Sequence, residues 1–293
     1  MFKKGLINEY LHASSIILPF IFMTGVKFNG RLGNQLFQFF FLLYLKSRSK
    51  SRFYFFVNPH HAYLCKFFDL GFYYNLTLSS KIYSIFTRIM PHLLSFKSIY
   101  IQNIQVPREV QLKGNTIYTG FFQTDWYINH TPEKFKIRVR KKYITKFQKL
   151  YGHIFANERT IVVHIRRTDY LKYGKRDISL PIKYFKTRLN SIANLEQYKV
   201  FFISDDIAYV RSVFAEKPNF IFSENDEIID FQIVQNADIA IISNSSFSWW
   251  AAYLGKKGSL VMAPKNWIGF RLNKEHPKGV MTSRFKWYDV FAT

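Results

Sequence analysis

The second half of the chain alternates regularly between apolar runs of strand length and stretches with a helical period. This spacing is typical of a parallel sheet whose strands are joined by right-handed helical crossovers. The carboxyl ends of such strands lie along one edge, where open α/β sheets bind their ligands. Strands are expected at 160–166, 198–203, 219–222, 238–242 and 259–263, with helices near 182–192, 207–214 and 227–236.

The first half shows a weaker version of this pattern. A short strand at 25–30 runs into a glycine turn and an apolar helical stretch that continues to Leu45. A second strand is expected at 53–57, and a further short strand with a polar turn at 118–127. The stretch 66–112 shows no clear period, so no element is predicted there.

Two domains of ordinary size fit within the 293 residues of the chain, and we expect one at 23–150 and another at 151–293. The boundary falls near 132–151, a basic stretch that is either a solvated helical face or a membrane contact. Residues 1–22 are an N-terminal extension of unclear role. Either the working protein begins at Met23, or the extension forms a helix that touches a membrane.

The charge balance is strongly basic. The chain has 42 Lys and Arg against 19 Asp and Glu, which gives a net charge of +23. Such a surface favours anionic partners, namely nucleic acid, an anionic membrane face or phosphorylated substrates. The basic residues are spread along the chain and not concentrated in a recognition helix. This spread argues against a nucleic-acid-binding protein, which is nevertheless kept as the alternative from another class.

The number of cysteines and the length of the apolar runs bear on where in the cell the protein is found. Cys65 is the only cysteine, which excludes an intramolecular disulfide and a Cys-based zinc site. No apolar run reaches the length of a spanning helix, and no small-residue cleavage site follows the apolar stretch 16–23. We therefore expect a cytoplasmic protein that is peripheral on the inner face of the membrane.

Two adjacent arginines follow the strand expected at 160–166. His164, Arg166, Arg167 and Asp169 stand together at its carboxyl end. An Arg side chain matches phosphate oxygens with two parallel hydrogen bonds and stays charged at physiological pH, so this cluster predicts an anion site. The alternatives are a pair of solvated surface arginines or a structural salt bridge between Arg167 and Asp169.

Further polar clusters follow the strands at 198–203 and 238–242. In a parallel sheet these clusters converge with the first one on a single edge. Asp205 and Asp206 favour helix capping or contact with a base or ribose over a metal, since no further acidic cluster is evident. The serines of 243–246 precede an expected helix, where hydroxyls and free amides either bind phosphate or cap the helix.

A glycine turn precedes the first expected helix. Gly30 and Gly33 permit a sharp strand-to-helix turn with exposed amides, which suits a phosphate or a sugar hydroxyl. The spacing is not that of a dinucleotide fold, and the lysine of a P-loop is absent. No serine occupies a G-x-S-x-G elbow, so a serine hydrolase is not indicated.

The joint pattern resembles the α-1,2-fucosyltransferases of glycosyltransferase family 11. The resemblance covers 23–270 in order, and 120–125 is similar to a Gly-Tyr-Phe/Trp-Gln-Ser-Glu segment of that family. A more distant similarity links 230–246 to the α-1,6- and protein O-fucosyltransferases. The residues that carry the resemblance are Gly30, Gly33, Asn34, Gln35, Phe37, Gln38, His164, Arg166, Arg167, Asp169, Tyr170 and 244–252.

The chain departs from the family pattern at a few positions. Arg31 and Thr168 stand where the family often has glycine, and Asp125 stands where it often has glutamate. The N-terminus is also longer than is usual in the family.

The resemblance implies a GT-B-like α/β fold, in which two Rossmann-type parallel-sheet domains face a cleft. The domain at 23–150 would be the acceptor side, and the domain at 151–293 would bind GDP-fucose. The implied reaction is metal-independent, inverting transfer of L-fucose from GDP-β-L-fucose to the 2-hydroxyl of a terminal galactose, with no cofactor. The acceptor would be a β-galactoside-terminated glycan, either free or linked to a membrane lipid. A GT-B glycosyltransferase for another nucleotide sugar is the alternative.

The resemblance also implies roles for individual residues. Arg166 would hold the β-phosphate, while His164 and Asp230 would contact the guanosine. Residues expected to bind the donor are Gly33, Asn34, Gln35, His164, Arg166, Arg167, Asp205, Asp230, Asn244, Ser245, Ser246 and Phe247. Those expected to act in catalysis are Arg166, Asp169 and Asp125, with Asp177 as a further candidate for the general base.

Overall fold

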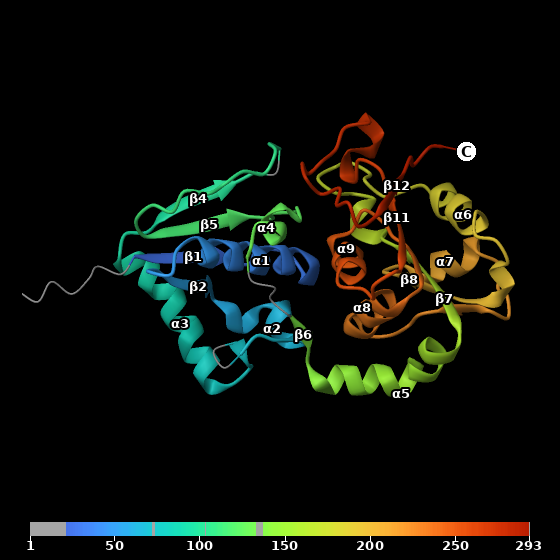
Figure 1. The fold of residues 1–293 in the computed structure, drawn as a ribbon, viewed down its shortest axis with the longest axis horizontal. Helices are drawn as coiled ribbons and strands as arrows, with labels where there is room; N and C mark the ends of the chain where they lie inside the picture. Colours follow the sequence, from blue (N-terminus) through green and yellow to red (C-terminus); the bar gives the residue numbers. More distant parts are fainter. Residues whose placement is uncertain (1–21, 72–73, 103, 133–136, 293) are drawn as a thin grey trace, which may run out of the picture.

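The structure is a computed structural model that describes residues 22–71, 74–102, 104–132 and 137–292. Within these ranges the first half of the chain forms one parallel sheet and the second half forms another, with helices packed against each (Figure 1). The predicted α/β class is therefore confirmed. Apart from Phe22, the predicted extension lies outside the described residues.

The C-terminal sheet is parallel throughout. Its strands are β7 (Arg159–Ile165), β8 (Tyr198–Ser204), β9 (Phe220–Phe222), β10 (Ile239–Ile241), β11 (Leu260–Pro264) and β12 (Lys286–Tyr288). They lie in the order β12-β11-β10-β7-β8-β9. In a doubly wound sheet of this order, ligands bind beyond the carboxyl ends of the two strands at which the order reverses, here β7 and β10.

Helices cover both faces of this sheet. They are α5 (Lys141–Asn157), α6 (Ile182–Asn190), α7 (Ile207–Val213), α8 (Glu227–Asn236) and α9 (Ser246–Tyr253). Val162 faces the core formed with α5, α8 and α9, whereas its neighbour Val163 faces the core formed with α6 and α7. Because β7 is buried on both faces, it reads as a continuous apolar run in the sequence.

The N-terminal sheet is also parallel, in the order β2-β1-β5-β4. Its strands are β1 (Met23–Lys27), β2 (Phe53–Val57), β4 (Lys97–Ile101) and β5 (Thr116–Gly120). The helices of this half are α1 (Leu32–Arg48), α2 (Tyr63–Phe67), α3 (Leu78–Leu93) and α4 (Trp126–Asn129), and β3 (Phe68–Asp69) pairs antiparallel with β6 (Arg138–Val139). Helix α1 covers one face through Val26, Phe41 and Tyr118, while α3 packs near β2 on the other.

Some elements differ from the sequence-based expectation. The stretch 66–112, for which no element was predicted, contains α3 and β4. Helix α3 turns Ser80, Ser84 and Thr87 inward, and most of its large apolar residues face outward, although Met90 and Pro91 are buried. A helix packed on a core usually shows the opposite arrangement. The helix expected at 132–151 occupies Lys141–Asn157 instead.

The two halves pack against each other through α1 and α9, which lie side by side between the sheets (Figure 1). The rings of Phe37 and Trp249 have centroids 4.7 Å apart, and Phe40 stacks on Trp250 at the same separation. Buried aromatic side chains such as these remove about 150–250 Å² each from water. The contact therefore joins the halves through an apolar core. No helix in the described part of the chain is long and apolar enough to cross a membrane.

Candidate active site

A cleft of about 820 Å³ lies between the two halves, beyond β7 and β10 and beside the start of α1. This volume is typical of a site for a small molecule or nucleotide. The predicted site residues that line it are Gly33, Asn34, His164, Arg166, Asp169, Asp205, Asp230, Ser245, Ser246 and Phe247. Four further predicted residues, Gln35, Asp125, Arg167 and Asn244, are not among its lining residues.

His164 is a buried, neutral side chain near the end of β7. Its Nδ1 atom lies 2.9 Å from Ser243 Oγ, and its ring stacks on Phe247 with centroids 5.5 Å apart. Burial lowers the pKa of His164 to about 3, and the charge of Arg166 acts in the same direction. A neutral imidazole offers one donor and one acceptor, so His164 suits a polar ligand edge better than an anion.

Arg166 is held in place by two carboxylates. Its Nε lies 2.8 Å from Asp169 Oδ1 and 3.3 Å from Asp205 Oδ2. Burial acts against its charge, but the two carboxylates outweigh this effect and raise the pKa of Arg166. Its terminal nitrogens have no hydrogen bond with any described residue, and the side chain lines the cleft. The guanidinium is therefore oriented and permanently charged, and it can still bind an anion.

Asp169 also reaches across the cleft. Its Oδ2 lies 2.7 Å from Nη2 of Arg31, which stands at the start of α1. Partial burial opposes ionisation, but hydrogen bonding and charge from Arg166 and then Arg31 lower the pKa of Asp169. A carboxylate shared by two arginines is a weak base, and its evident effect here is to fix Arg166.

Arg167 points elsewhere. Its guanidinium lies 3.6 Å from the centre of the Tyr209 ring, and its Nε pairs with Asp206 at 3.3 Å. The suggested salt bridge to Asp169 is therefore not formed. The adjacent Asp205 accepts hydrogen bonds from the backbone amides of Arg167 and Thr168 at 2.8 and 3.1 Å. Asp206 also caps α7, as the capping interpretation predicted.

The start of α9 also lines the cleft, after the strand that neighbours β7. Ser245 occupies the N-cap position but makes no side-chain capping bond, so the amides of the first turn have no capping side chain among the described residues. Gly33 packs against this turn, because a Cβ on Gly33 would lie 2.3 Å from the backbone carbon of Ser246. A helix start with free amides and a positive dipole end suits a phosphate.

The N-terminal wall is formed by polar side chains that brace the turn before α1. Asn34 accepts a hydrogen bond from Gln123 at 2.9 Å, and both residues line the cleft. Gln35 instead donates to the carbonyl of Gly30 at 3.0 Å and accepts from the amide of Leu64 at 2.9 Å. Its amide group is thus engaged at both ends in holding the turn.

The other predicted residues lie behind or beside the cleft. Asn244 is fully buried and donates to the carbonyl of Ile178 at 2.8 Å, while its Oδ1 has no partner among the described residues. Asp125 stands at the N-cap of α4. Asp177 accepts from the amide of Ser179 at 2.8 Å and faces Arg271. Neither aspartate lines the cleft, so their predicted role as general base stays a prediction.

Two acidic side chains of α8 line the cleft with perturbed ionisation. Burial raises the pKa of Asp230 to about 7, against hydrogen bonds from Ser223 and Asn225. Burial also raises the pKa of Glu227, against the positive charges around it. Carboxyls with raised pKa in a cleft are candidates for proton transfer. Glu227 was not predicted from the sequence, although its place in the first turn of the expected 227–236 helix, next to the Asp230 motif, could have indicated it.

The described residues contain no group of three or more His, Cys, Asp or Glu side chains arranged to hold a metal ion. Cys65 is buried and burial raises its pKa to about 12, so its thiol is protonated in the fold.

Comparisons with known proteins place these motifs in a family. An Escherichia coli alpha-1,2-colitosyltransferase is 30% identical over 174 residues, which are 54% of this chain and 58% of that protein. The Escherichia coli O-antigen biosynthesis glycosyltransferase WbnK is 31% identical over 124 residues, 39% of this chain and 41% of that protein. The chain thus spans about half the length of these curated relatives.

A solved structure shows the same fold. The crystal structure of the fucosyltransferase NodZ from Bradyrhizobium superposes with a TM-score of 0.50 at 14% identity, over 80% of this chain and 92% of that chain. This likeness concerns the fold alone, and it confirms the expected GT-B-like arrangement of two domains about a cleft. The sequence profile of Glycosyl transferase family 11 matches residues 10–287, and the chain belongs to that family.

Proposed function

We propose that this protein is a glycosyltransferase that moves L-fucose from GDP-β-L-fucose to the 2-hydroxyl of a terminal galactose, with inversion and without a metal ion. The acceptor is a β-galactoside-terminated glycan. Membership of the family supports glycosyl transfer, and the resemblance of the motifs to α-1,2-fucosyltransferases supports the donor, the linkage and the acceptor.

The observation that carries the proposal is the setting of Arg166. Two carboxylates hold its Nε, its terminal nitrogens have no hydrogen bond with a described residue, and the start of α9 lines the same cleft. This arrangement supplies a fixed positive charge and open amides for a diphosphate. Neutral His164 and the partly protonated Asp230 supply polar contacts of the kind that a guanine base needs.

The chemistry follows from the charge that develops as the sugar leaves. Departure of GDP places negative charge on the β-phosphate, which Arg166 and the α9 amides stabilise. The acceptor hydroxyl attacks the oxocarbenium-like sugar from the opposite face, so the β-linked donor gives an α-linked product. The hydroxyl proton passes to a carboxylate. Among the cleft carboxyls not assigned to the guanine, Glu227, whose pKa is raised, is a better base than Asp169, whose pKa is lowered by two arginines.

GDP-colitose is a second candidate donor, because one relative is named a colitosyltransferase. Colitose is L-fucose without its 3-hydroxyl, so a fucose site and a colitose site differ in how they treat one polar group. A site that hydrogen-bonds the hydroxyl rejects the deoxy sugar strongly, whereas an apolar site discriminates weakly.

The test is incubation of the purified protein with GDP-[14C]fucose and lactose in the presence of EDTA, with parallel reactions containing GDP-colitose and other nucleotide sugars. An α-1,2-fucosylated lactose is the expected product, at a rate unaffected by EDTA. Turnover of GDP-colitose alone, or of another nucleotide sugar alone, would replace the proposed donor. Transfer that stops with EDTA and resumes with added divalent cation would contradict the metal-independent mechanism.

A further inference from the structure

Helix α3 is amphipathic, but most of its polar face is buried and its apolar face is exposed. Its buried residues are Ser80, Ser84 and Thr87, joined near the C-terminal end of the helix by Met90 and Pro91. These hydroxyls bond to the loop after β2: the amide of His60 donates to Ser84 at 2.7 Å, and the amide of Asn58 donates to Thr87 at 3.2 Å. Polar contacts along most of its length, with Met90 and Pro91 at its C-terminal end, therefore hold α3 against the N-terminal half.

The opposite face of α3 is apolar and exposed. Its residues recur every three or four positions, so they share one side of the helix. Isolated exposed apolar residues are ordinary, but a continuous stripe of this length marks an interaction surface. The outward face consists of Leu78 (73% exposed), Ile82 (59%), Ile85 (44%), Phe86 (48%), Ile89 (46%) and Leu93 (76%).

Basic side chains run along one edge of this stripe. Lys81, Arg88 and His92 lie on the same flank of α3, and none has an ion pair with a described residue. No Asp or Glu occurs between Asp69 and Glu109 in the sequence. An exposed apolar stripe with a basic flank is the arrangement of helices that lie in the plane of an anionic lipid surface.

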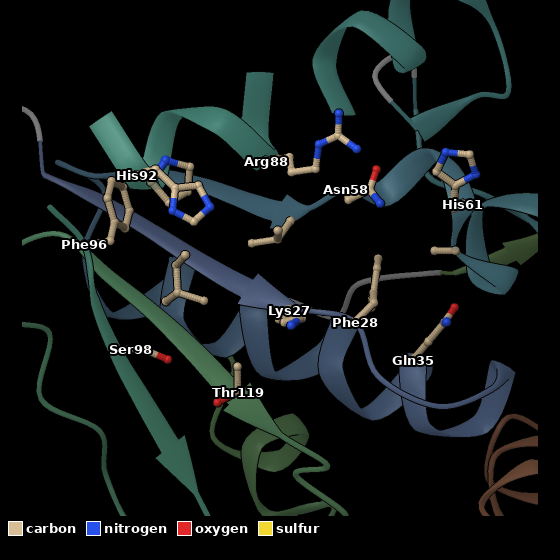
Figure 2. A pocket seen from close by; sticks show the side chains of 14 residues that line it. Lys27, Phe28, Gln35, Asn58, His61, Arg88, His92, Phe96, Ser98 and Thr119 are labelled. Carbon is tan, nitrogen blue, oxygen red and sulfur yellow. The ribbon is translucent and has the colours of Figure 1, made fainter. Parts of the chain in front are cut away.

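Beside this flank lies a cavity of about 590 Å³, here called the basic pocket. Arg88 and His92 line it from α3, and Lys27 lines it from β1 (Figure 2). Every charged or titratable residue that lines it is basic, the fourth being His61. Lys27 is exposed at the end of a central strand with no hydrogen bond or ion pair to a described residue, and a lysine so placed favours an anionic ligand.

We propose that the outward face of α3 docks on a bilayer that contains anionic phospholipid, with lipid phosphate groups entering the basic pocket. The apolar side chains enter the boundary between head groups and acyl chains, and the basic flank meets the head groups. The complementarity of charge selects a membrane over a second copy of this chain, because a second copy would bring the same positive flank and a net charge of +23 to the contact.

This surface differs from the basic stretch first considered for membrane contact. Helix α5 buries Phe147 and packs Tyr151 and Phe155 on the C-terminal core, so its apolar residues are largely engaged. Its exposed apolar residues Ile144 and Leu150 are 40% and 47% exposed, close to Phe86 and Ile89 of α3, but they form no continuous stripe. Helix α5 therefore provides matched control positions.

Docking is tested by co-sedimentation of the full-length protein with vesicles, without nucleotide or acceptor, so that the result is independent of the proposed reaction. Binding is expected to vesicles of phosphatidylcholine with phosphatidylglycerol, to be weak on phosphatidylcholine alone, and to fall as salt rises. The double variant Phe86→Ser/Ile89→Ser should lower partitioning by about tenfold or more. Lys81→Gln/Arg88→Gln should lower it by about fivefold for each charge removed.

The control variants are Ile144→Ser/Leu150→Ser and Lys142→Gln/Lys149→Gln on α5, which should bind as the unchanged protein does. Circular dichroism of every variant reports whether the fold is kept.

Absence of vesicle binding by the unchanged protein overturns the proposal, as does loss of binding in the α5 variants with retention in the α3 variants. Sedimentation as a dimer that Phe86→Ser/Ile89→Ser dissociates, with no lipid binding, would assign the face to a second copy. Vesicle binding that appears only after removal of residues 1–21 would assign it to that segment.

Discussion

Arg31 and Asp169 join the two halves of the protein across the cleft, with Nη2 and Oδ2 separated by 2.7 Å. The second oxygen of Asp169 binds Arg166, so one carboxylate links an arginine of the N-terminal half to the anion-binding arginine of the other. The position of Arg166 thus depends on how the two halves are placed.

Replacing Asp169 with Asn should weaken donor binding while leaving the fold intact. The pair with Arg31 is about half exposed, and such pairs contribute about 0–1 kcal/mol to stability. Arg166 would lose its best-placed anchor, and the affinity for GDP should fall by about tenfold, as for loss of a charged hydrogen bond. Calorimetric titration with GDP measures this change. Glu158→Gln is the control, because the Glu158 carboxylate is as exposed as that of Asp169 and pairs with Lys199 away from the cleft. Equal losses in both variants would contradict the assignment.

Arg166→Ala should slow sugar transfer by at least about 100-fold. Removal of a single preorganised group that stabilises developing charge typically lowers kcat by about 100- to 1,000-fold. Arg167→Ala is the matched comparison, because the neighbouring side chain packs on Tyr209 and pairs with Asp206 outside the cleft. We expect that variant to keep most of its turnover and to lose some stability. Initial rates and thermal melting of both variants separate these effects, and near-normal transfer by Arg166→Ala would remove its phosphate role.

Gly33→Ala should disturb both stability and activity. A Cβ at this position would lie 2.3 Å from Ser246 and 2.4 Å from the amide of Phe247, so α1 and α9 would have to move apart. Overpacking of this kind typically costs about 1–3 kcal/mol.

The control for that prediction is Gly152→Ala, also within a helix. Its Cβ would meet the flexible end of Gln148, so the variant should be unchanged or slightly more stable, since alanine favours helices by up to about 1 kcal/mol. Urea denaturation of the two variants gives the comparison. A Gly33→Ala protein as stable and active as the unchanged one would show that α1 and α9 do not need this close approach.

The ionisation of Asp230 should make stability depend on pH. Its pKa is about 7 in the fold, above the usual value of 3.8, so the folded state binds the proton more tightly than the unfolded state does. The stabilisation is complete below the unfolded value and is lost as pH rises toward 7. The free energy of unfolding should therefore decrease from pH 4 to pH 7 relative to that of Asp230→Asn, in which this group does not ionise. Urea denaturation at a series of pH values tests this, and parallel curves for the two proteins would argue against the raised pKa.

The C-terminal half could be predicted closely because its elements have simple causes. A strand buried on both faces must be apolar throughout, so the run ending at Ile165 was evident, as was the helix at 227–236. The cleft residues Arg166 and Asp205 follow such strands directly, and Ser245 lies four residues after the end of β10. Their convergence could be inferred from parallel topology alone.

Other features depend on packing that no local pattern records. The turn of Arg167 toward Tyr209 depends on where α7 lies relative to β7. The contact between Arg31 and Asp169 requires the relative placement of two domains. The sequence of α3 does carry a helical period, in Leu78, Ile82 and Ile89, so this helix could have been predicted. What the period could not show is that its apolar side faces outward.

The packing of α1 on α9 has a mechanical consequence for the cleft. Phe37 and Phe40 rest on Trp249 and Trp250 directly behind the ligand-facing turns of both helices. Any widening of the cleft that preserves this packing must be a rotation about it. The two halves then turn about this aromatic cluster, and a small rotation changes the distance between Arg31 and Asp169 across the cleft. Opening for nucleotide exchange and release of Arg166 would in that case be one and the same motion.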